Sequence, residues 1–487
     1  MIKVRHIMTE SKMYQPEQLR LPHDDPDRWK DIMRHIRSPY PVDGTEFANL
    51  LRNVAVDRPE VSRAVRGACK LFSADVMGDE GVSVFFQNTL PFILYCITQL
   101  PMQFPSGHLD LLVTGKNHTV TLTKSQVLCL FCCGMLGILP YPKASKTWMK
   151  AQRDADKPAH TGRRGRFPSL TLVRLYASFS ATTYQSTLHK LHCMLHYVVR
   201  MQDRDLHMGI PPSGDVIHYT RLVAARGHTL PDNLRHRKGY LCAVHMHDRG
   251  SIEDAGTEYL QADFANKYIG GGVVGNGCVQ EEIRFAISPE CLVSLTLCEV
   301  MEKNEAIVIR GTERFCAYSG YSRSFRFAGP YTDRVDHKQG AIVAVDAVDF
   351  SGQVNAQYKW GYMKRDLGKA LTGFTYTSTF FGRPMRGVAT GNWGCGAFKG
   401  QVALKFLIQW VAVSIAQADR PESPLTMQYY SFGDPAGGAL SDLVSYVQEN
   451  PIHIGTLWSA LRSYSTEENA EHTSEGLVGF VMRKIMR

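Results

Sequence analysis

A dense glycine cluster in the second half of the chain constrains its fold more than any other feature. Five glycines fall within residues 270–277, and Gln280, Glu281 and Glu282 follow closely. Glycine costs backbone entropy, so such a cluster is typical of positive φ angles or of a backbone that closely approaches another group. A strand-like run ends near residue 266, and an apolar pattern that fits a helix continues to about residue 299. This stretch is therefore predicted to form a strand, a glycine loop and a helix.

The two carboxylates indicate what kind of ligand this loop would bind. Backbone N–H groups in a glycine loop and at a helix start form an anion site, and phosphate is the usual anion there. Carboxylates beside a simple phosphate cradle would repel the ligand, so Glu281 and Glu282 indicate that another part of the ligand reacts here. A general acid and a carboxylate that holds a sugar would fit.

The same glycines also match the dinucleotide fingerprint of nicotinamide-dependent oxidoreductases. Gly270, Gly272 and Gly275 have its spacing, and Glu299 lies at about the distance of its ribose-binding acid. However, residues 276–278 prolong the loop, and another strand-like run already precedes it. The match is weak, and the oxidoreductase remains an alternative.

Composition places the chain among ordinary globular proteins. Of its 487 residues, 44% are hydrophobic and 21% are charged, a length that suggests two or three domains. A net charge of +9 and a pI near 8.9 are a modest indication of a polyanionic partner, although a merely basic surface explains them more simply.

The twelve cysteines are scattered, and many lie in apolar surroundings, which indicates free thiols in a reducing compartment. Cys129 and Cys132 have the spacing of a redox or zinc pair, but no second pair completes it, so core packing is predicted. The start has no signal-peptide pattern, and the longest apolar runs, 90–100 and 127–140, are too short to span a bilayer. We expect an intracellular protein, nuclear or cytoplasmic, with no bound metal and no membrane association.

The apolar pattern divides the chain near residue 205. Before it come a proline-dotted arm, helical periodicity from about residue 43 to 140, and a basic loop at 141–168 that is more simply solvated than bound to a polyanion. Thr123 to Gln126 would cap a buried helix there. After it, short apolar runs alternate with helical ones, which is typical of a layered α/β domain with a mostly buried sheet. We expect strands at 240–245, 260–264, 306–310, 340–347 and 427–432, and helices at 281–303, 360–371 and 396–417.

Three further segments carry candidate binding residues. A second glycine loop at 390–398 also precedes a helix, and two such loops can hold a pyrophosphate from both sides. Residues 311–327 combine aromatic rings with arginines, which could stack on adenine and pair phosphate or simply pack on the sheet edge. His192 and His196 lie four apart on a helix, but leucines form a core stripe there and no acid completes a metal set.

Six short motifs resemble the poly(ADP-ribose) glycohydrolase family. In chain order they are Ser251–Asp254, Asp263–Asn266, Gly270–Gly272 followed by Gln280–Glu282, Tyr318–Tyr321, Gly391–Phe398 and Phe432–Asp434. The resemblance extends from about residue 60 to 465. It implies a macrodomain-like three-layer α/β/α fold with a mixed sheet, preceded by an all-helical accessory domain. Residues 1–204 would then form the arm and the accessory domain, and residues 205–487 the catalytic domain.

The resemblance also implies an activity and roles for individual residues. The activity is hydrolysis of the ribose–ribose O-glycosidic (1″–2′) bonds of poly(ADP-ribose), with release of ADP-ribose. Glu282 resembles the general acid, which then acts as the base. Glu281 and Asn266 resemble residues that orient the ribose, and Asp263 a support for that loop. The other residues resemble substrate contacts. Ile252, Glu253 and Gln280 resemble contacts to the adenine, Tyr321 with Tyr318 resembles the cover over the adenine–ribose end, and Phe432 resembles the ring against the ribose. The residues that resemble the diphosphate contacts are Gly270, Gly271, Gly272, Val273, Val274, Gly275, Asn392, Gly394, Cys395, Gly396, Ala397 and Phe398.

The chemistry of the bond agrees with these roles. Cleavage of a ribosyl acetal passes through an oxocarbenium-like state, so the leaving 2′-oxygen needs a proton from an acid. The expected partners are poly(ADP-ribose) and poly(ADP-ribosyl)ated proteins, as in the DNA damage response, without a cofactor and without direct nucleic-acid binding. We expect a monomer that prefers chain ends and leaves the last protein-linked ADP-ribose in place. A non-catalytic ADP-ribose reader with the same fold is the alternative.

Overall fold

The computed structural model describes residues 17–37, 39–56, 58–142, 166–179, 185–208, 215–224, 234, 239–332, 340–378, 385–419, 424–466 and 476–486. Most of the basic loop expected at 141–168 lies outside these residues. The division into domains near residue 205 stays a prediction.

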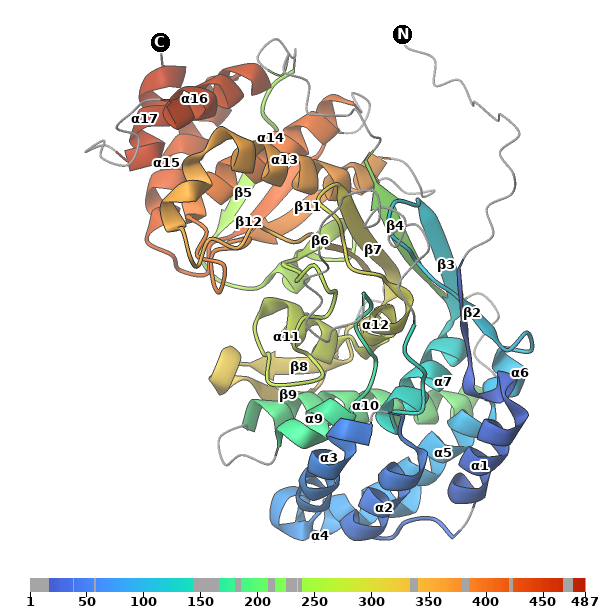
Figure 1. The fold of residues 1–487 in the computed structure, drawn as a ribbon. Helices are drawn as coiled ribbons and strands as arrows, with labels where there is room; N and C mark the ends of the chain where they lie inside the picture. Colours follow the sequence, from blue (N-terminus) through green and yellow to red (C-terminus); the bar gives the residue numbers. More distant parts are fainter. Residues whose placement is uncertain are drawn as a thin grey trace, which may run out of the picture.

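A mixed eight-stranded sheet forms the centre of the molecule (Figure 1). Its strands lie in the order β3 (His118–Thr123), β4 (Val216–Val223), β7 (Glu305–Thr312), β10 (Gly340–Ala344), β6 (Tyr259–Asp263), β11 (Gly387–Gly391), β12 (Thr426–Tyr430) and β5 (Ala243–His247). The last five are mutually parallel, whereas β7, β4 and β3 pair antiparallel. The predicted layered α/β fold with a mixed sheet is confirmed.

The register brings the ends of the parallel strands to one edge of the sheet. Ala344 pairs with Asp263, and Gly391 pairs with Tyr430, which in turn pairs with His247. The segments that follow these strands contain the motifs singled out in the sequence. Ligands of open α/β sheets bind at this carboxyl edge. The strand register therefore gathers motifs that are far apart in the chain.

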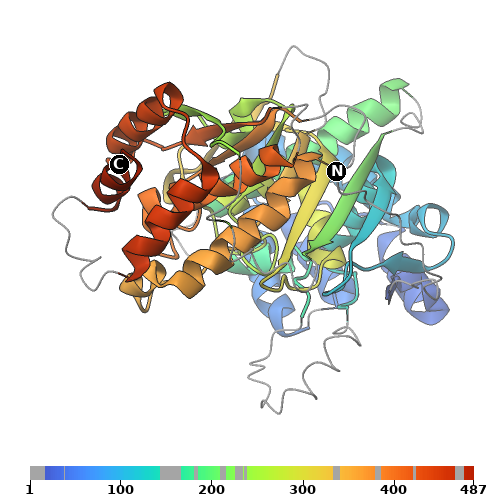
Figure 2. The same ribbon diagram turned by 90° about the horizontal axis from the view of Figure 1, so that it is seen from above.

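Helices cover both faces of the sheet, and Figures 1 and 2 show the two layers. One layer consists of α13 (Trp360–Phe374), α14 (Val402–Ala418), α15 (Ala436–Glu449), α16 (Ile454–Thr466) and α17 (Gly476–Ile485). In it, α13 packs on β7 and β10, α14 on β11 and β12, and α15 on β5. The C-terminal helix α17 packs on α14, α15 and α16 through buried Leu477 and Phe480.

The opposite face of the sheet meets the helical N-terminal part. Its helices are α1 (Pro26–Ile36), α2 (Gly44–Val54), α3 (Arg58–Leu71), α4 (Ala74–Val84), α5 (Leu90–Thr98), α6 (Leu100–Gln103), α7 (Lys124–Met135), α9 (Val173–Ser178) and α10 (Gln185–Met208), joined by α11 (Gln280–Ile287) and α12 (Ser294–Leu297). Side chains of this part, of α11 and of the sheet form one continuous core, and a second core lies on the other face. The sheet is thus buried on both sides.

Local signals explain why the helices begin where they do. Asp43 caps α2, accepting the backbone N–H groups of Thr45 and Glu46 at 2.8 Å each. Thr123 and Gln126 form the predicted capping box of α7. The N-terminal part is not helical throughout, however. It contains β1 (Gln18–Arg20) and β2 (His108–Asp110), which pair with each other, and β3, which extends the central sheet.

The helix after the first glycine loop is shorter than expected. It was predicted to run to about residue 299, but α11 ends at Ile287. Pro289 follows, and a proline disfavours helical backbone in the residue before it. The chain continues as a short 3₁₀ turn and α12, all buried.

Buried ion pairs join the helical part to the sheet. Lys124 of α7 contacts Glu313, whose other oxygen accepts Arg204 of α10 at 2.7 Å. Arg221 of β4 pairs with Glu305 of β7. Breaking a buried pair leaves an uncompensated charge, so these contacts hold the two parts in a defined arrangement.

One helical run passes a length and composition test for a membrane span. Residues 74–98, which contain α4 and α5, form one run with a kink at Gly78, whose φ is +73°. By length and composition this run is a longer candidate than the runs 90–100 and 127–140 that the sequence pattern indicates. A π-helical turn from Phe85 to Thr89 joins α4 to α5, and Pro91 falls in the first turn of α5, where its missing N–H is tolerated. Phe85, Leu90 and Ile93 within it are buried in the helical core.

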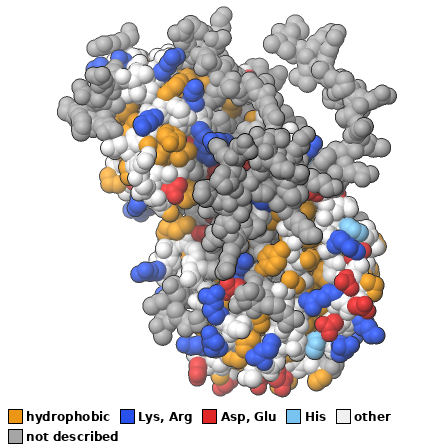
Figure 3. Space-filling model, in the orientation of Figure 1, with side chains coloured by type: hydrophobic (Ala, Val, Ile, Leu, Met, Phe, Trp, Pro, Cys, Tyr) orange, Lys and Arg blue, Asp and Glu red, His pale blue; other side chains and the backbone are white. Residues whose placement is uncertain are grey.

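Charged side chains of both signs are interspersed on the helical part that Figure 3 shows. On this face, the described lysines and arginines do not gather into one basic field. The net charge of +9 therefore does not give this face a general attraction for polyanions.

Candidate active site

The first glycine loop, 270–277, wraps around two adjacent carboxylates in the first turn of α11. Glu281 accepts the backbone N–H groups of Gly270 at 2.6 Å and of Asn266 at 2.8 Å. Glu282 accepts those of Gly272 and Val279, both at 2.8 Å. The backbone thus fixes both side chains, and the loop and the helix start form one rigid unit.

The glycines are needed because the carboxylates leave no room for side chains. A Cβ on Gly271 would lie 2.5 Å from Glu282 Oε1 and 2.6 Å from Glu281 Oε2. A Cβ on Gly277 would lie 2.7 Å from the same Glu282 oxygen. Gly270 and Gly271 also have φ angles of +87° and +51°. Close approach and positive φ, the two reasons inferred for the cluster, are therefore both present.

A buried lysine of the helical part binds the backbone carbonyls of the same loop. Lys190 of α10 donates hydrogen bonds to the carbonyl oxygens of Val273, Gly275 and Gly277 at 3.0, 2.7 and 2.5 Å. Burial lowers the pKa of Lys190 to about 8. Lys190 is not among the residues predicted for the site, because the leucines of its helix indicate a core stripe. A lysine in an otherwise apolar stripe was the available signal.

Asp263, at the end of β6, is the most deeply buried carboxyl of the site. Neither of its oxygens has a hydrogen-bond partner among the residues that the structure describes. The expected support of the loop comes instead from Gln280, which accepts the Phe264 N–H at 2.7 Å and donates to the Ala262 carbonyl at 3.1 Å. These bonds bracket Asp263 and tie the helix start to the strand end. An adenine contact of Gln280 stays a prediction.

Three carboxyls in one buried place interact strongly. Burial raises the pKa of Asp263, Glu282 adds to the shift, and Arg284 opposes it. Burial likewise raises the pKa of Glu281, with further contributions from Asp263 and Glu282, against the two backbone N–H groups that it accepts. Such a cluster does not stay fully ionised at neutral pH. Glu282 is 6% exposed, more than the other two carboxyls, so of the three it is the most accessible to a ligand.

Tyr321 lies at the mouth of this cluster. Burial around its hydroxyl raises the pKa of Tyr321, the Gln280 backbone N–H opposes the shift, and Glu282 adds to it. The residue as a whole is still 55% exposed. The hydroxyl is thus directed at the carboxylates, while the rest of the side chain faces solvent, as a residue that covers a bound ligand would.

The 251–254 motif lies at the turn η4 (Ile252–Ala255), between β5 and β6. Ile252 is buried against Ala389 and Tyr430. Glu253 accepts the Tyr318 hydroxyl at 2.6 Å. Tyr318 belongs to the hairpin of β8 (Cys316–Ser319) and β9 (Arg326–Pro330). The 318–321 motif and the 251–254 motif are therefore brought together.

The second glycine loop follows β11 and is anchored to residues at the ends of β12 and β10. Asn392 donates to the Ser431 carbonyl at 2.9 Å and accepts the Tyr429 hydroxyl at 2.8 Å. Trp393 Nε1 donates to the Val345 carbonyl at 2.9 Å. The backbone N–H groups of Gly396, Ala397 and Phe398 form no hydrogen bond with any other described residue. Consecutive free N–H groups on an anchored loop suit a phosphate.

Phe432 has a strained backbone. Its φ is +53°, which a non-glycine residue rarely adopts, and its side chain is 48% exposed. Its ring lies above Gly391, where a Cβ would come within 2.9 Å of a ring carbon. Phe432 comes shortly after the end of β12, so it lies at the same edge of the sheet as the two loops. Strain that persists at a ligand site commonly serves binding.

The other sequence candidates have different surroundings in the structure. Among the described residues, no group of three or more His, Cys, Asp or Glu is placed to hold a metal. Cys129 and Cys132 are buried in α7 with free thiols, as core packing predicts. Glu299, the ribose-binding acid of the oxidoreductase alternative, binds Arg166 at 3.2 Å and the Thr114 N–H at 2.9 Å instead.

Comparisons with known proteins agree with this geometry. A family model described as poly(ADP-ribose) glycohydrolase, Macro domain fold, matches residues 231–437, and one described as the helical domain of the same family matches residues 77–221. The chain is also 31% identical over 386 residues to poly(ADP-ribose) glycohydrolase 1 of Arabidopsis thaliana, covering 65% of this chain and 67% of that protein. The chain belongs to the poly(ADP-ribose) glycohydrolase family.

Two further relatives of this family match. The probable poly(ADP-ribose) glycohydrolase 2 of Arabidopsis thaliana is 32% identical over 343 residues, which are 61% of this chain and 63% of that protein. Poly(ADP-ribose) glycohydrolase 1 of Caenorhabditis elegans is 33% identical over 270 residues, 52% of this chain and 33% of that protein. The chain thus spans about two thirds of the plant relatives' length. All the candidate site residues from 252 to 432 lie in the matched macrodomain, whereas Lys190 lies in the matched helical domain.

Proposed function

We propose that this chain hydrolyses the ribose–ribose O-glycosidic (1″–2′) bonds of poly(ADP-ribose) and releases ADP-ribose. The observation that carries the proposal is the pair Glu281 and Glu282, held by backbone N–H groups of a glycine loop at the carboxyl edge of a macrodomain-type sheet. A loop that only bound ADP-ribose would gain nothing from burying two carboxylates against its own backbone, because buried charge is costly.

In the proposed reaction, Glu282 donates a proton to the 2′-oxygen of the leaving adenosine ribose while the C1″–O bond breaks. The sugar passes through an oxocarbenium-like state that the diphosphate charge of the same unit stabilises. Water then attacks C1″, and the Glu282 carboxylate takes its proton. One water is consumed, and the products are ADP-ribose and a polymer end with a free 2′-hydroxyl. No cofactor takes part in this scheme.

The remaining residues would position the substrate. Glu281 would hold ribose hydroxyls. It also accepts the Asn266 backbone N–H and would thereby fix that backbone beside the scissile bond. The free N–H groups of 396–398 and the loop 270–277 would bind the diphosphate. Ile252 and Glu253 would face the adenine, Tyr321 would cover the adenine–ribose end, and Phe432 would pack against the ribose.

The test compares the native chain with Glu282→Gln, which keeps the size of the side chain and one of the two oxygens that accept backbone N–H groups, but cannot donate or accept the proton in the same way. We expect the native chain to release ADP-ribose from purified poly(ADP-ribose), and the variant to lose turnover while binding ADP-ribose about as tightly as the native chain does. A native chain that binds ADP-ribose but releases none is the reader of the alternative, and that result rejects the proposal.

A further inference from the structure

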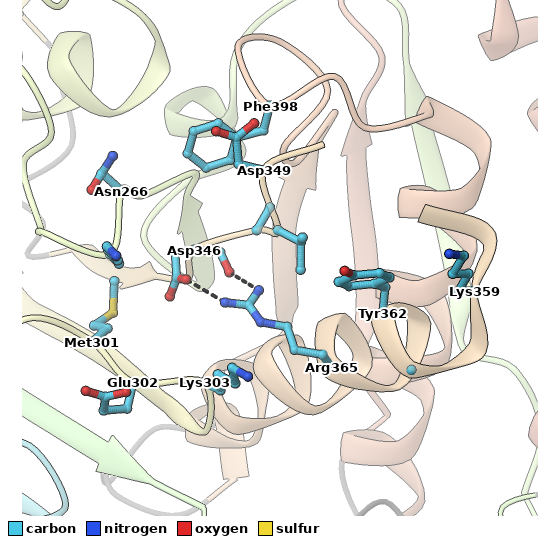
Figure 4. A pocket seen from close by; sticks show the side chains of 14 residues that line it. Asn266, Met301, Glu302, Lys303, Asp346, Asp349, Lys359, Tyr362, Arg365 and Phe398 are labelled. Atoms are coloured by element: carbon cyan, nitrogen blue, oxygen red, sulfur yellow. Dashed lines mark hydrogen bonds and ion pairs between the residues drawn. The ribbon is translucent and has the colours of Figure 1, made fainter. Parts of the chain in front are cut away.

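A cavity of about 820 Å³ opens directly beside the proposed active site. Asn266 and Phe398, which belong to that site, also line the cavity, whereas Glu281, Glu282 and the adenine-side residues do not. Figure 4 shows Asn266 at one end of the cavity and Lys359 at the other. The cavity therefore continues from the place where the ribose would be cleaved, and it is large enough for a nucleotide.

The acidic side chains of this cavity are already engaged. Asp346 accepts Arg365 Nη2 at 2.6 Å, as the dashed lines of Figure 4 show. Glu302 pairs with Arg166 at 3.0 Å. Asp349 accepts a backbone N–H of its own turn at 2.9 Å. The two ion pairs offset the charges of Asp346 and Glu302, so these acids oppose an incoming anion only weakly, whereas Asp349, which accepts a neutral N–H, keeps its charge.

The lysines of the cavity are not engaged in this way. Lys303 and Lys359 form no ion pair or side-chain hydrogen bond with any residue that the structure describes, and Lys267 only lies 5.8 Å from the centre of the Tyr268 ring. The rings of Tyr362 and Phe398 line the same cavity. Free ammonium groups beside aromatic rings suit a ligand that joins phosphates to a base.

We propose that this cavity binds the next ADP-ribose unit of the polymer, on the leaving side of the bond that is cut. The inference rests on the proposed function, because only a polymer has such a unit. Lys267, Lys303 and Lys359 are spread along the cavity and would attract its phosphates, and its adenine would lie against Tyr362 or Phe398. The terminal unit occupies the first site, and the chain crosses from one site to the other at Asn266.

The consequence is a preference for polymer over free ADP-ribose that depends on charge. Binding two phosphates to partly exposed lysines gains a modest energy for each pair, and salt screens it. The preference should therefore weaken as ionic strength rises, whereas the affinity for free ADP-ribose should change less.

The experiment measures binding by calorimetry to the non-cleaving Glu282→Gln protein, with ADP-ribose and with the two-unit oligomer as probes. The test variant adds Lys303→Gln and Lys359→Gln. The control adds Lys364→Gln, which removes one positive charge from α13 outside the cavity and is compared with the single variant Lys303→Gln. We expect the double variant to bind the two-unit oligomer about tenfold more weakly with unchanged affinity for ADP-ribose. The control should keep both affinities.

A charge reversal sharpens the test, because Lys303→Glu should weaken oligomer binding more than Lys303→Gln does. Equal losses for both probes, or no loss for either, would overturn the inference while leaving the proposed function intact. A Glu282→Gln protein that bound neither probe, from a native chain without activity, would instead count against the proposed function itself.

Discussion

Lys190 offers the sharpest test of how the helical part supports the site. In Lys190→Met, three loop carbonyls lose a charged donor, and hydrogen bonds to charged groups are worth about 1.5–3 kcal/mol each. Against this loss, the lysine no longer has to be buried as a charge. Its pKa falls from 10.5 to about 8, which corresponds to roughly 3 kcal/mol at about 1.4 kcal/mol per pKa unit. The net loss of loop stability is therefore about 1.5–6 kcal/mol.

If this loss disorders the loop, kcat/KM on poly(ADP-ribose) should drop by a factor of roughly 10 to 10⁴. The control is Lys124→Met, which removes another fully buried lysine that contacts Glu290 and Glu313 rather than the loop. Both variants should lower the melting temperature. Lys124→Met should keep a kcat/KM near that of the native chain, once corrected for the folded fraction.

The pH dependence separates a positioning role from a purely structural one. Above about pH 8 the neutral Lys190 amine has two N–H groups for three carbonyls, so native kcat/KM should fall with an apparent pKa of about 8. That limb should be missing in Lys190→Met. The stability effect has the opposite sign. Between about pH 8 and 10.5 the unfolded chain binds the proton that the native chain has lost, so the cost of burying Lys190 shrinks as pH rises. Equal kcat/KM in the two lysine variants would refute the positioning role.

Three further substitutions test other parts of the site. Gly271→Ala should lower kcat by about 100-fold or more, because its Cβ would lie 2.5 Å from Glu282 Oε1, whereas Gly352→Ala, with open space around it, should have little effect in the same assay. In Asp263→Asn, calorimetric melting should show a gain over the native chain that grows from pH 5 to pH 8. The reason is that the pKa of Asp263 is higher in the native chain than in the unfolded chain, so the native chain loses stability as pH rises above the unfolded pKa of this carboxyl. An amide at this position does not titrate, so the variant lacks this loss. Phe432→Gly should relieve about 1 kcal/mol of backbone strain and keep or raise the melting temperature, yet bind ADP-ribose several-fold more weakly; unchanged affinity would deny the ring its role.

The strand, glycine loop and helix around residue 270 could be predicted because their signals are local. Glycines, acids and short apolar runs can be recognised in the sequence, and the structure has the predicted strand, loop and helix between residues 259 and 287. The predicted end of this helix near residue 299 was wrong although the signal was local, because Pro289 in the sequence indicates an earlier end.

Other parts depended on contacts distant in sequence. The strand β3 lies in a helix-rich stretch, and only its pairing with β4, about a hundred residues later, makes it part of the sheet. Lys190 is buried because three carbonyls more than 80 residues away accept its hydrogen bonds. Gln280 takes over the support expected of Asp263 through a strand end whose position the sheet determines. Oligomeric state and cellular location stay predictions.

The central claim is that this site breaks the glycosidic bond by acid–base catalysis. The most direct measurement is mass spectrometry of the products formed from poly(ADP-ribose) in ¹⁸O-enriched water, under brief incubation. We predict ADP-ribose that carries one ¹⁸O at C1″, with no such product from Glu282→Gln. ADP-ribose without the label, labelled phosphate groups from pyrophosphate cleavage, or unchanged label incorporation in Glu282→Gln would contradict the account.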